Sequence, residues 1–171
     1  MWEHAAALAW WERAQKGEVW TPGNVQRDAA LALLLAVHQL NEDIAEGIGF
    51  ADKGTLVIDT IDGGRVVWEI ADEIGHGEWD CAVRESALSA GLILVCACTG
   101  HRTCVPNSRF LFHGLDIRDY EASDRQRAEW FAERTKMPAE FWLAHCGEDF
   151  GFGAEEALEF GVVHEIAGDA A

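Results

Sequence analysis

The hydrophobic pattern of the chain switches repeatedly between two periods, which predicts strands and helices in alternation. Runs rich in β-branched and aromatic residues predict strands at 18–20, 55–60, 80–83, 103–105, 109–112 and 162–166. Apolar positions three and four residues apart predict helices at 5–15, 28–40, 66–74, 90–98, 123–136, 138–144 and 154–160. This alternation favours an α/β fold in which right-handed crossovers join parallel strands covered by helices.

Several residues that could form turns or take part in a reaction lie at the ends of these predicted elements. Asn41-Glu42-Asp43 is predicted to close the helix at 28–40, and Gly63-Gly64 forms a tight turn after a strand. Ser89 precedes the helix at 90–98, and His113 follows the strand at 109–112. In sheets of this type the active groups gather at strand ends. We therefore expect the Gly63-Gly64 turn, Ser89 and His113 to converge.

Length and composition indicate one folded unit. The chain has 171 residues, of which 49% are hydrophobic and 25% charged, as in soluble globular proteins. It has no internal repeat, and its three prolines mark no linker. We predict a single domain over 1–171, with residues 1–16 as an additional N-terminal helix.

The charge balance limits the possible partners. The 30 acidic and 13 basic residues give a formal net charge of −17, which repels phosphate backbones and anionic lipid, so we expect neither nucleic-acid nor membrane partners. The N-terminal sequence lacks the basic region of a signal peptide. Five cysteines without CxxC spacing favour reduced thiols. Together these features predict a cytoplasmic protein.

No cofactor or metal is expected from the motifs. The histidines lack metal-ligand spacing such as HxxxH, and neither GxGxxG nor GxxxxGK[ST] occurs. If an ATPase takes part in the function, it is therefore a separate chain.

Ser89, His113 and Asp149 together provide the groups for acyl transfer at a serine. A serine hydroxyl needs a base to accept its proton, and an acid that orients the base and stabilises its cation. Each residue also has a structural interpretation: Ser89 as a helix N-cap and Asp149 as a solvated turn residue. The order and element positions of the three favour the catalytic interpretation.

Three sequence blocks then carry a resemblance to a known family. They are Leu88-Ser89-Ala90-Gly91, the run from Pro106-Asn107-Ser108-Arg109 to His113, and the segment from Asp149 to Ala154-Glu155-Glu156-Ala157. From Thr55 to Ile166 the chain resembles ClpP, the proteolytic subunit of the Clp protease, and more broadly the ClpP/crotonase superfamily. The resemblance implies an α/β spiral of βαβ units.

The resemblance also implies roles and an activity. Ser89 corresponds to the nucleophile, His113 to the base and Asp149 to the orienting acid, and the backbone N–H groups of Gly64 and Ala90 to the oxyanion hole. The implied function is a serine-type endopeptidase that cleaves peptides or unfolded proteins, inside a homo-oligomeric ring. Whether an AAA+ unfoldase docks on it, and whether the ring is single or double, stays open.

Two other functions remain open at this stage. The first is a non-catalytic ClpP-like scaffold subunit, suggested by Glu85 four residues before the nucleophile and by the altered turn at 60–64. The second is a crotonase-like acyl-CoA enzyme, which shares the spiral but does not need the triad. The aromatic residues Trp130, Phe131, Phe141 and Trp142 are expected either in the core or at a subunit interface.

Overall fold

The computed structural model describes residues 17–20, 27–47, 52–58, 67–114 and 121–168. The predicted N-terminal helix over 1–16 and the Gly63-Gly64 turn lie outside these residues. The single-domain prediction over 1–171 accordingly stays a prediction.

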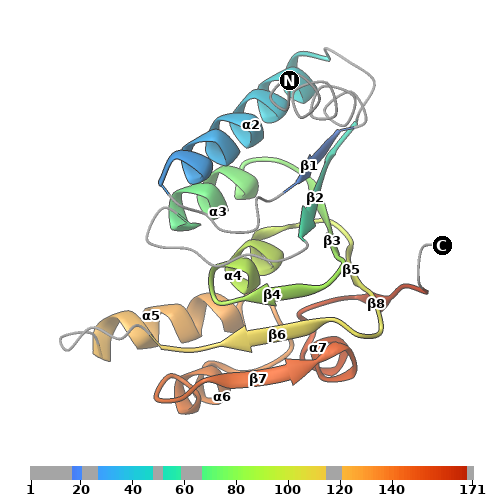
Figure 1. Cartoon of the computed structure of the whole chain (residues 1–171). Coiled ribbons are helices and arrows are strands. Elements are labelled where there is room, and N and C mark those ends of the chain that lie inside the picture. The colour runs from blue at the N-terminus through green and yellow to red at the C-terminus, as the bar shows by residue number, and fades with distance from the viewer. Residues whose placement is uncertain (1–16, 21–26, 48–51, 59–66, 115–120, 169–171) are drawn as a thin grey trace.

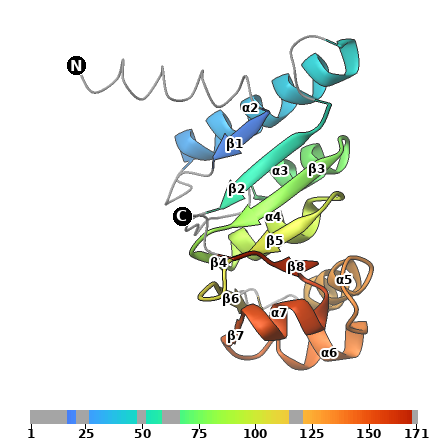
Figure 2. The same cartoon turned by 90° about the vertical axis from the view of Figure 1, so that its right-hand side faces the viewer.

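Five strands form a fully parallel sheet in the order β1-β2-β3-β5-β8. These strands are β1 (Glu18–Trp20), β2 (Gly54–Ile58), β3 (Trp79–Val83), β5 (Arg102–Cys104) and β8 (Glu165–Ile166). Figure 2 shows them side by side. Because parallel neighbours need a crossover connection, the segments between the strands return the chain to the same end of the sheet.

Three helices cover one face of this sheet (Figures 1 and 2): α2 (Arg27–Glu46), α3 (Val67–Gly75) and α4 (Ala90–Ala97). Burial in β3 alternates accordingly, with Trp79, Cys81 and Val83 buried and the residues between them only partly so. All eight residues of α4 are buried. A helix that is apolar all round lies inside the protein, which explains the uninterrupted apolar sequence of α4.

A second, three-stranded sheet lies beyond the first. Here β4 (Ser86–Leu88) pairs in parallel with β6 (Arg109–Phe112), and β6 pairs antiparallel with β7 (Phe150–Gly153). The last three helices gather around this sheet, as Figure 1 shows. They are α5 (Glu121–Ala132), α6 (Ala139–Ala144) and α7 (Ala154–Phe160).

The predicted alternation of strands and helices is confirmed. The strands β4 and β7 were not predicted, and the predicted end of α2 was wrong. The helix predicted at 28–40 continues through Asn41-Glu42-Asp43 to Glu46. The Asn41 amide donates to the Glu73 carbonyl (2.8 Å) and accepts from the Trp79 indole (2.8 Å). Because its side chain bonds to neighbouring elements and not to its own backbone, it does not stop the helix.

The predicted helix at 123–136 ends earlier, at Ala132. The Thr135 hydroxyl donates to the Phe131 carbonyl (2.7 Å), and the Lys136 N–H donates to the Phe160 carbonyl (2.7 Å). Side-chain and long-range bonds replace the helical ladder here, so the chain leaves the helix before the apolar pattern ends.

The aromatic residues of α5 and α6 form a core under the second sheet. Phe131 and Trp142 are buried, and each lies about 5 Å from the ring of Phe112 on β6 (5.1 and 5.0 Å between centroids). Trp130 and Phe141 are partly buried against the same core. The core alternative therefore holds for Phe131 and Trp142.

All five cysteines are free thiols, and four of them are buried. Among the described residues, no helix is long and apolar enough to cross a membrane, and no group of three or more His, Cys, Asp or Glu residues could hold a metal ion.

Asp80 on β3 fixes the start of β5 and gives a test of stability against pH. Its carboxylate accepts from the His101 N–H (2.7 Å) and pairs with the Lys53 ammonium (2.6 Å). Burial raises the pKa of this carboxyl, but the Lys53 ammonium and the His101 N–H lower it by more. The net effect is a pKa below the ordinary 3.8. A lowered pKa means that the ionised form stabilises the fold.

We expect Asp80→Ala to lower the free energy of unfolding by about 1–3 kcal/mol at neutral pH. The difference from the unsubstituted chain should shrink as the pH falls below about 4, because the unfolded chain then takes up a proton at Asp80 that the folded chain binds only at lower pH, and it should vanish below the folded-state pKa. Urea unfolding at about pH 7 and pH 3 measures both values. Asp52→Ala, at an exposed carboxylate, is the control. If Asp80→Ala lowered the free energy of unfolding equally at both pH values, this role would be contradicted.

Candidate active site

Ser89 occupies a strained turn between β4 and α4. Its backbone angles are φ 53° and ψ −103°, and it is the only non-glycine residue with a positive φ among those described. Such a conformation costs of order 1–3 kcal/mol and persists only where surrounding contacts enforce it. Here the Ser89 N–H donates to the Leu111 carbonyl on β6 (2.9 Å). A serine on a sharp strand-to-helix turn presents its hydroxyl outward from the sheet.

The Ser89 side chain does not cap the helix that it precedes. Its hydroxyl is therefore available to other partners. The first N–H groups of a helix have no partner within the helix, and in α4 the first of these belongs to Ala90. The other predicted oxyanion donor, Gly64, lies outside the described residues.

His113 stands directly beside the Ser89 hydroxyl. The distance from His113 Nε2 to Ser89 Oγ is 2.7 Å. The two residues follow neighbouring parallel strands, in which Leu88 pairs with Leu111. The sheet register therefore sets the separation between the hydroxyl and the imidazole, and it brings together two residues that are 24 positions apart.

The other ring nitrogen of His113 fixes its tautomer. Nδ1 lies 2.6 Å from the carbonyl oxygen of Gly114. A carbonyl oxygen only accepts, so Nδ1 carries the proton and Nε2 presents a lone pair to the Ser89 hydroxyl. This is the tautomer that a general base for Ser89 requires.

Gly114 reaches this position because it has no side chain. Its N–H donates to the Cys146 carbonyl (3.0 Å), and a Cβ on Gly114 would collide with that same oxygen. The close approach holds the chain after β6 against the loop that leads to β7.

Asp149 directly precedes β7 and has an exposed side chain, and no hydrogen bond joins it to His113 within the described structure. The β6–β7 register pairs Phe112 with Phe150. The pairing ends there; His113 directly follows β6 and Asp149 directly precedes β7, so that both residues lie at the same end of this strand pair. In the conformation described, the Gly114 carbonyl accepts the hydrogen bond that Nδ1–H donates.

Arg127 on α5 binds the backbone of His113, a role that was not predicted from the sequence. Its Nη1 donates to the backbone carbonyl of His113 (2.6 Å), and its side chain is buried. Burial lowers the pKa of this guanidinium, although Asp124 nearby raises it. One feature of the sequence could have indicated this role. Arg127 precedes Phe131 by four residues, so that both lie on the same, apolar face of α5.

Glu85, which motivated the scaffold alternative, has an exposed side chain. Its backbone carbonyl accepts from the Arg109 N–H (3.0 Å), so that this residue takes part in the β4–β6 pairing.

The order of strands and helices gives this chain a ClpP-like α/β fold. Its fold is similar to that of a ClpP1 mutant from Listeria monocytogenes, with a TM-score of 0.76 at 18% identity over 93% of this chain and 96% of that one. The predicted fold class is thereby confirmed.

Two curated relatives support the resemblance in sequence. The chain is 32% identical over 101 residues to ATP-dependent Clp protease proteolytic subunit 1 of Rhodopirellula baltica, covering 49% of this chain and 43% of that protein. It is 28% identical over 101 residues to proteolytic subunit 3 of Rhizobium meliloti, covering 52% of each. The chain thus spans about half the length of the curated relatives it matches. No family model matches it.

Proposed function

We propose that this chain is a serine-type endopeptidase that hydrolyses peptide bonds at Ser89. The observation that carries the proposal is the 2.7 Å contact between Ser89 Oγ and His113 Nε2, in the tautomer that lets the imidazole accept the hydroxyl proton. The similarity to proteins named as Clp protease proteolytic subunits supports a peptide substrate.

In the proposed reaction Ser89 Oγ attacks the peptide carbonyl while His113 Nε2 takes the hydroxyl proton. The protonated imidazole then gives this proton to the leaving amine, and a water molecule repeats the sequence to release the acid. The acyl-enzyme bond forms as the peptide C–N bond breaks, so that protons and atoms balance. The strained Ser89 turn keeps the nucleophile in place before the substrate binds.

Charge stabilisation in this reaction is assigned to three groups. The backbone N–H groups of Ala90 and Gly64 would donate to the oxyanion, since helix N-termini favour negative charge. Asp149 would replace the Gly114 carbonyl at His113 Nδ1 and stabilise the imidazolium. A carbonyl fixes the tautomer, but a carboxylate also offsets the positive charge that develops on the ring.

We also propose a cytoplasmic homo-oligomeric ring acting on peptides or unfolded proteins. The two relatives are named as ATP-dependent. Because this sequence carries no nucleotide-binding signature, any ATP dependence would belong to a separate unfoldase chain. Sedimentation analysis of the purified chain tests the ring directly.

A fluorophosphonate probe tests the catalytic proposal. We expect covalent labelling of the chain that is lost in Ser89→Ala and in His113→Ala, and that persists in the matched control Ser86→Ala. Mass spectrometry of the labelled peptide identifies the modified serine. Labelling that persists in Ser89→Ala, or absence of labelling in the folded and assembled chain, would refute the proposal.

A non-catalytic scaffold is the second candidate. It is favoured by the Nδ1 contact, in which His113 meets the Gly114 carbonyl and not the Asp149 carboxylate. The labelling experiment separates the two functions, because a scaffold would assemble without reacting with the probe.

Arg127 gives a further prediction as a positioning residue. We expect Arg127→Met to lower the rate of labelling at Ser89 by about tenfold, because the His113 backbone loses a charge-assisted bond. Arg127→Lys should recover part of the rate, since lysine keeps one donor and the charge. Thermal unfolding of both variants separates positioning from stability. Equal labelling rates in the three chains would contradict this role.

A further inference from the structure

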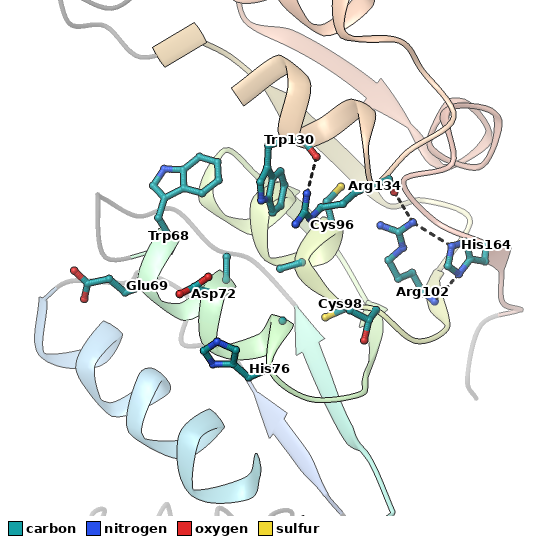
Figure 3. A pocket seen from close by; sticks show the side chains of 14 residues that line it. Trp68, Glu69, Asp72, His76, Cys96, Cys98, Arg102, Trp130, Arg134 and His164 are labelled. Atoms are coloured by element: carbon teal, nitrogen blue, oxygen red, sulfur yellow. Dashed lines mark hydrogen bonds between the residues drawn. The ribbon is translucent and has the colours of Figure 1, made fainter. Parts of the chain in front are cut away.

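A cavity of about 730 Å³ lies away from Ser89, at the opposite end of α4. The wall includes residues of α3, the last residues of α4, Arg102 on β5, Trp130 on α5 and Arg134 just beyond α5 (Figure 3). Along α4 the separation from Ser89 is roughly 12 Å, at 1.5 Å rise per residue. Its volume falls within the range of small-molecule sites, about 300–1,000 Å³.

Arg102 is a buried guanidinium with unfilled hydrogen-bonding capacity. Its Nη2 lies 2.9 Å from the carbonyls of both Arg134 and Gly161, which use its two hydrogens. His164 Nε2 lies 3.1 Å from the same Nη2, so that this contact involves neither Nε nor Nη1. Nε is buried without a partner, and Nη1 makes no hydrogen bond among the described residues.

The charge of Arg102 is also uncompensated. Its side chain is only 6% exposed, and within the described residues no carboxylate lies within salt-bridge distance of it. A buried charge without a partner is costly, and an anion that reached it would offset this cost. Figure 3 shows the guanidinium with one end toward His164 and the Arg134 carbonyl, and the other toward the cavity. The cavity therefore has a fixed cationic end.

Aromatic rings form another part of the wall. Trp68 and Trp130 meet edge to face with 5.3 Å between their centroids, and both are partly buried. The guanidinium of Arg134 lies over the Trp130 ring at 4.2 Å. This arrangement offers an indole surface next to the cationic end, which suits an apolar or aromatic body that carries one negative charge.

The remaining charges of the wall argue against polyanions. Glu69 and Asp72 on α3 line the cavity, and the carbonyl end of α4 faces it with partial negative charge. Cys96 and Cys98 offer no thiolate, because burial raises the pKa of the Cys96 thiol to about 12 and that of Cys98 well above its ordinary value. Arg102 and Arg134 therefore give the wall no excess of positive charge over Glu69 and Asp72, which does not favour a phosphate or nucleic acid.

We infer that this cavity binds a small organic monocarboxylate with an aromatic body. The carboxylate accepts from the Nη1 N–H groups of Arg102, and the body lies against the indoles of Trp68 and Trp130. The ligand is either a free small molecule or the carboxyl-terminal residue of a peptide, which share this chemistry. The site is separate from Ser89 and does not depend on peptidase activity.

Calorimetry of the full chain with indole-3-acetate and indole-3-acetamide tests the inference. The two probes differ in charge but have nearly the same shape. We expect the acid to bind at least about tenfold more tightly than the amide. Arg102→Gln should reduce the affinity for the acid to that for the amide. Nitrogen-15 signals of the Trp68 and Trp130 indoles, assigned from Trp→Phe variants, should shift on binding. A tetrapeptide ending in tryptophan, with free or amidated carboxyl terminus, then shows whether a chain end is accepted.

Arg102 is buried, and its replacement could unfold the chain. Trp68→Ala therefore provides a second variant, whose affinity for indole-3-acetate should also fall by about tenfold. Arg125→Gln, at an exposed arginine of α5, should bind as the unsubstituted chain does. Carboxylate-dependent binding of either the indole acid or the peptide supports the inference. Equal affinities for acid and amide in both probe pairs, absence of binding up to ~10 mM, or unchanged affinity in Trp68→Ala would overturn it.

Discussion

His113→Ala is expected to lower the rate of peptide hydrolysis by about 10⁴-fold or more. The imidazole lies 2.7 Å from the Ser89 hydroxyl, and without it that hydroxyl has no base to accept its proton. The measurement is single-turnover cleavage of a fluorogenic peptide by the assembled chain. Ser89→Ala should be as inactive as His113→Ala, and the double variant no worse, because the two residues act as a unit.

Asp149→Asn separates the two possible partners of His113 Nδ1. If Asp149 stabilises the imidazolium during turnover, its replacement should reduce the rate by orders of magnitude while leaving peptide binding intact. A rate equal to that of the unsubstituted chain would show that Nδ1 keeps its hydrogen bond to the Gly114 carbonyl during turnover (2.6 Å between nitrogen and oxygen). Ser86→Ala again serves as the control, and an inactive Ser86→Ala would contradict the assignment of Ser89 as nucleophile.

Trp142→Ala is expected to cost about 3–5 kcal/mol in the free energy of unfolding. The Trp142 side chain is fully buried, lies 5.0 Å from both Phe112 and Phe131, and donates through its indole N–H to the Thr135 hydroxyl (3.1 Å). Its removal leaves a cavity under β6, the strand that leads to His113. Urea unfolding followed by far-ultraviolet circular dichroism measures the loss.

Leu35→Ala is the matched control for this prediction. Leu35 on α2 is 58% exposed, so that truncating it should change the free energy of unfolding by less than about 0.5 kcal/mol. If Trp142→Ala were no more destabilising than Leu35→Ala, the aromatic residues beneath the second sheet would not form a cooperative core.

The elements that the sequence predicted well are those whose pattern is local. The strands at 18–20 and 109–112 and the helix at 154–160 match β1, β6 and α7 at both ends. The strand β7 was missed because it reads Phe-Gly-Phe-Gly, and glycine is depleted in strands. It is a strand because its partner β6 supplies hydrogen bonds along a long-range pairing that no local pattern encodes.

The same distinction applies to the candidate site. The residue types and order of Ser89 and His113 were enough to predict that they would converge, since both follow strands that end at one edge. The Gly114 carbonyl at Nδ1 and the Arg127 guanidinium behind the His113 backbone depend on tertiary contacts. Their positions follow from how α5 and the loop before β7 pack on β6, which sequence spacing does not determine.

The pairing of β4 with β6 constrains how homologous sequences can vary in length. Leu88 faces Leu111 across this ladder, and each strand is followed by one member of the serine–histidine pair. Inserting one residue within β6, between Arg109 and Phe112, without compensation would move the imidazole by about 3.3 Å and turn it to the opposite side of the strand. Active homologues should therefore conserve the length of this strand more strictly than its composition, and tolerate insertions in surface loops.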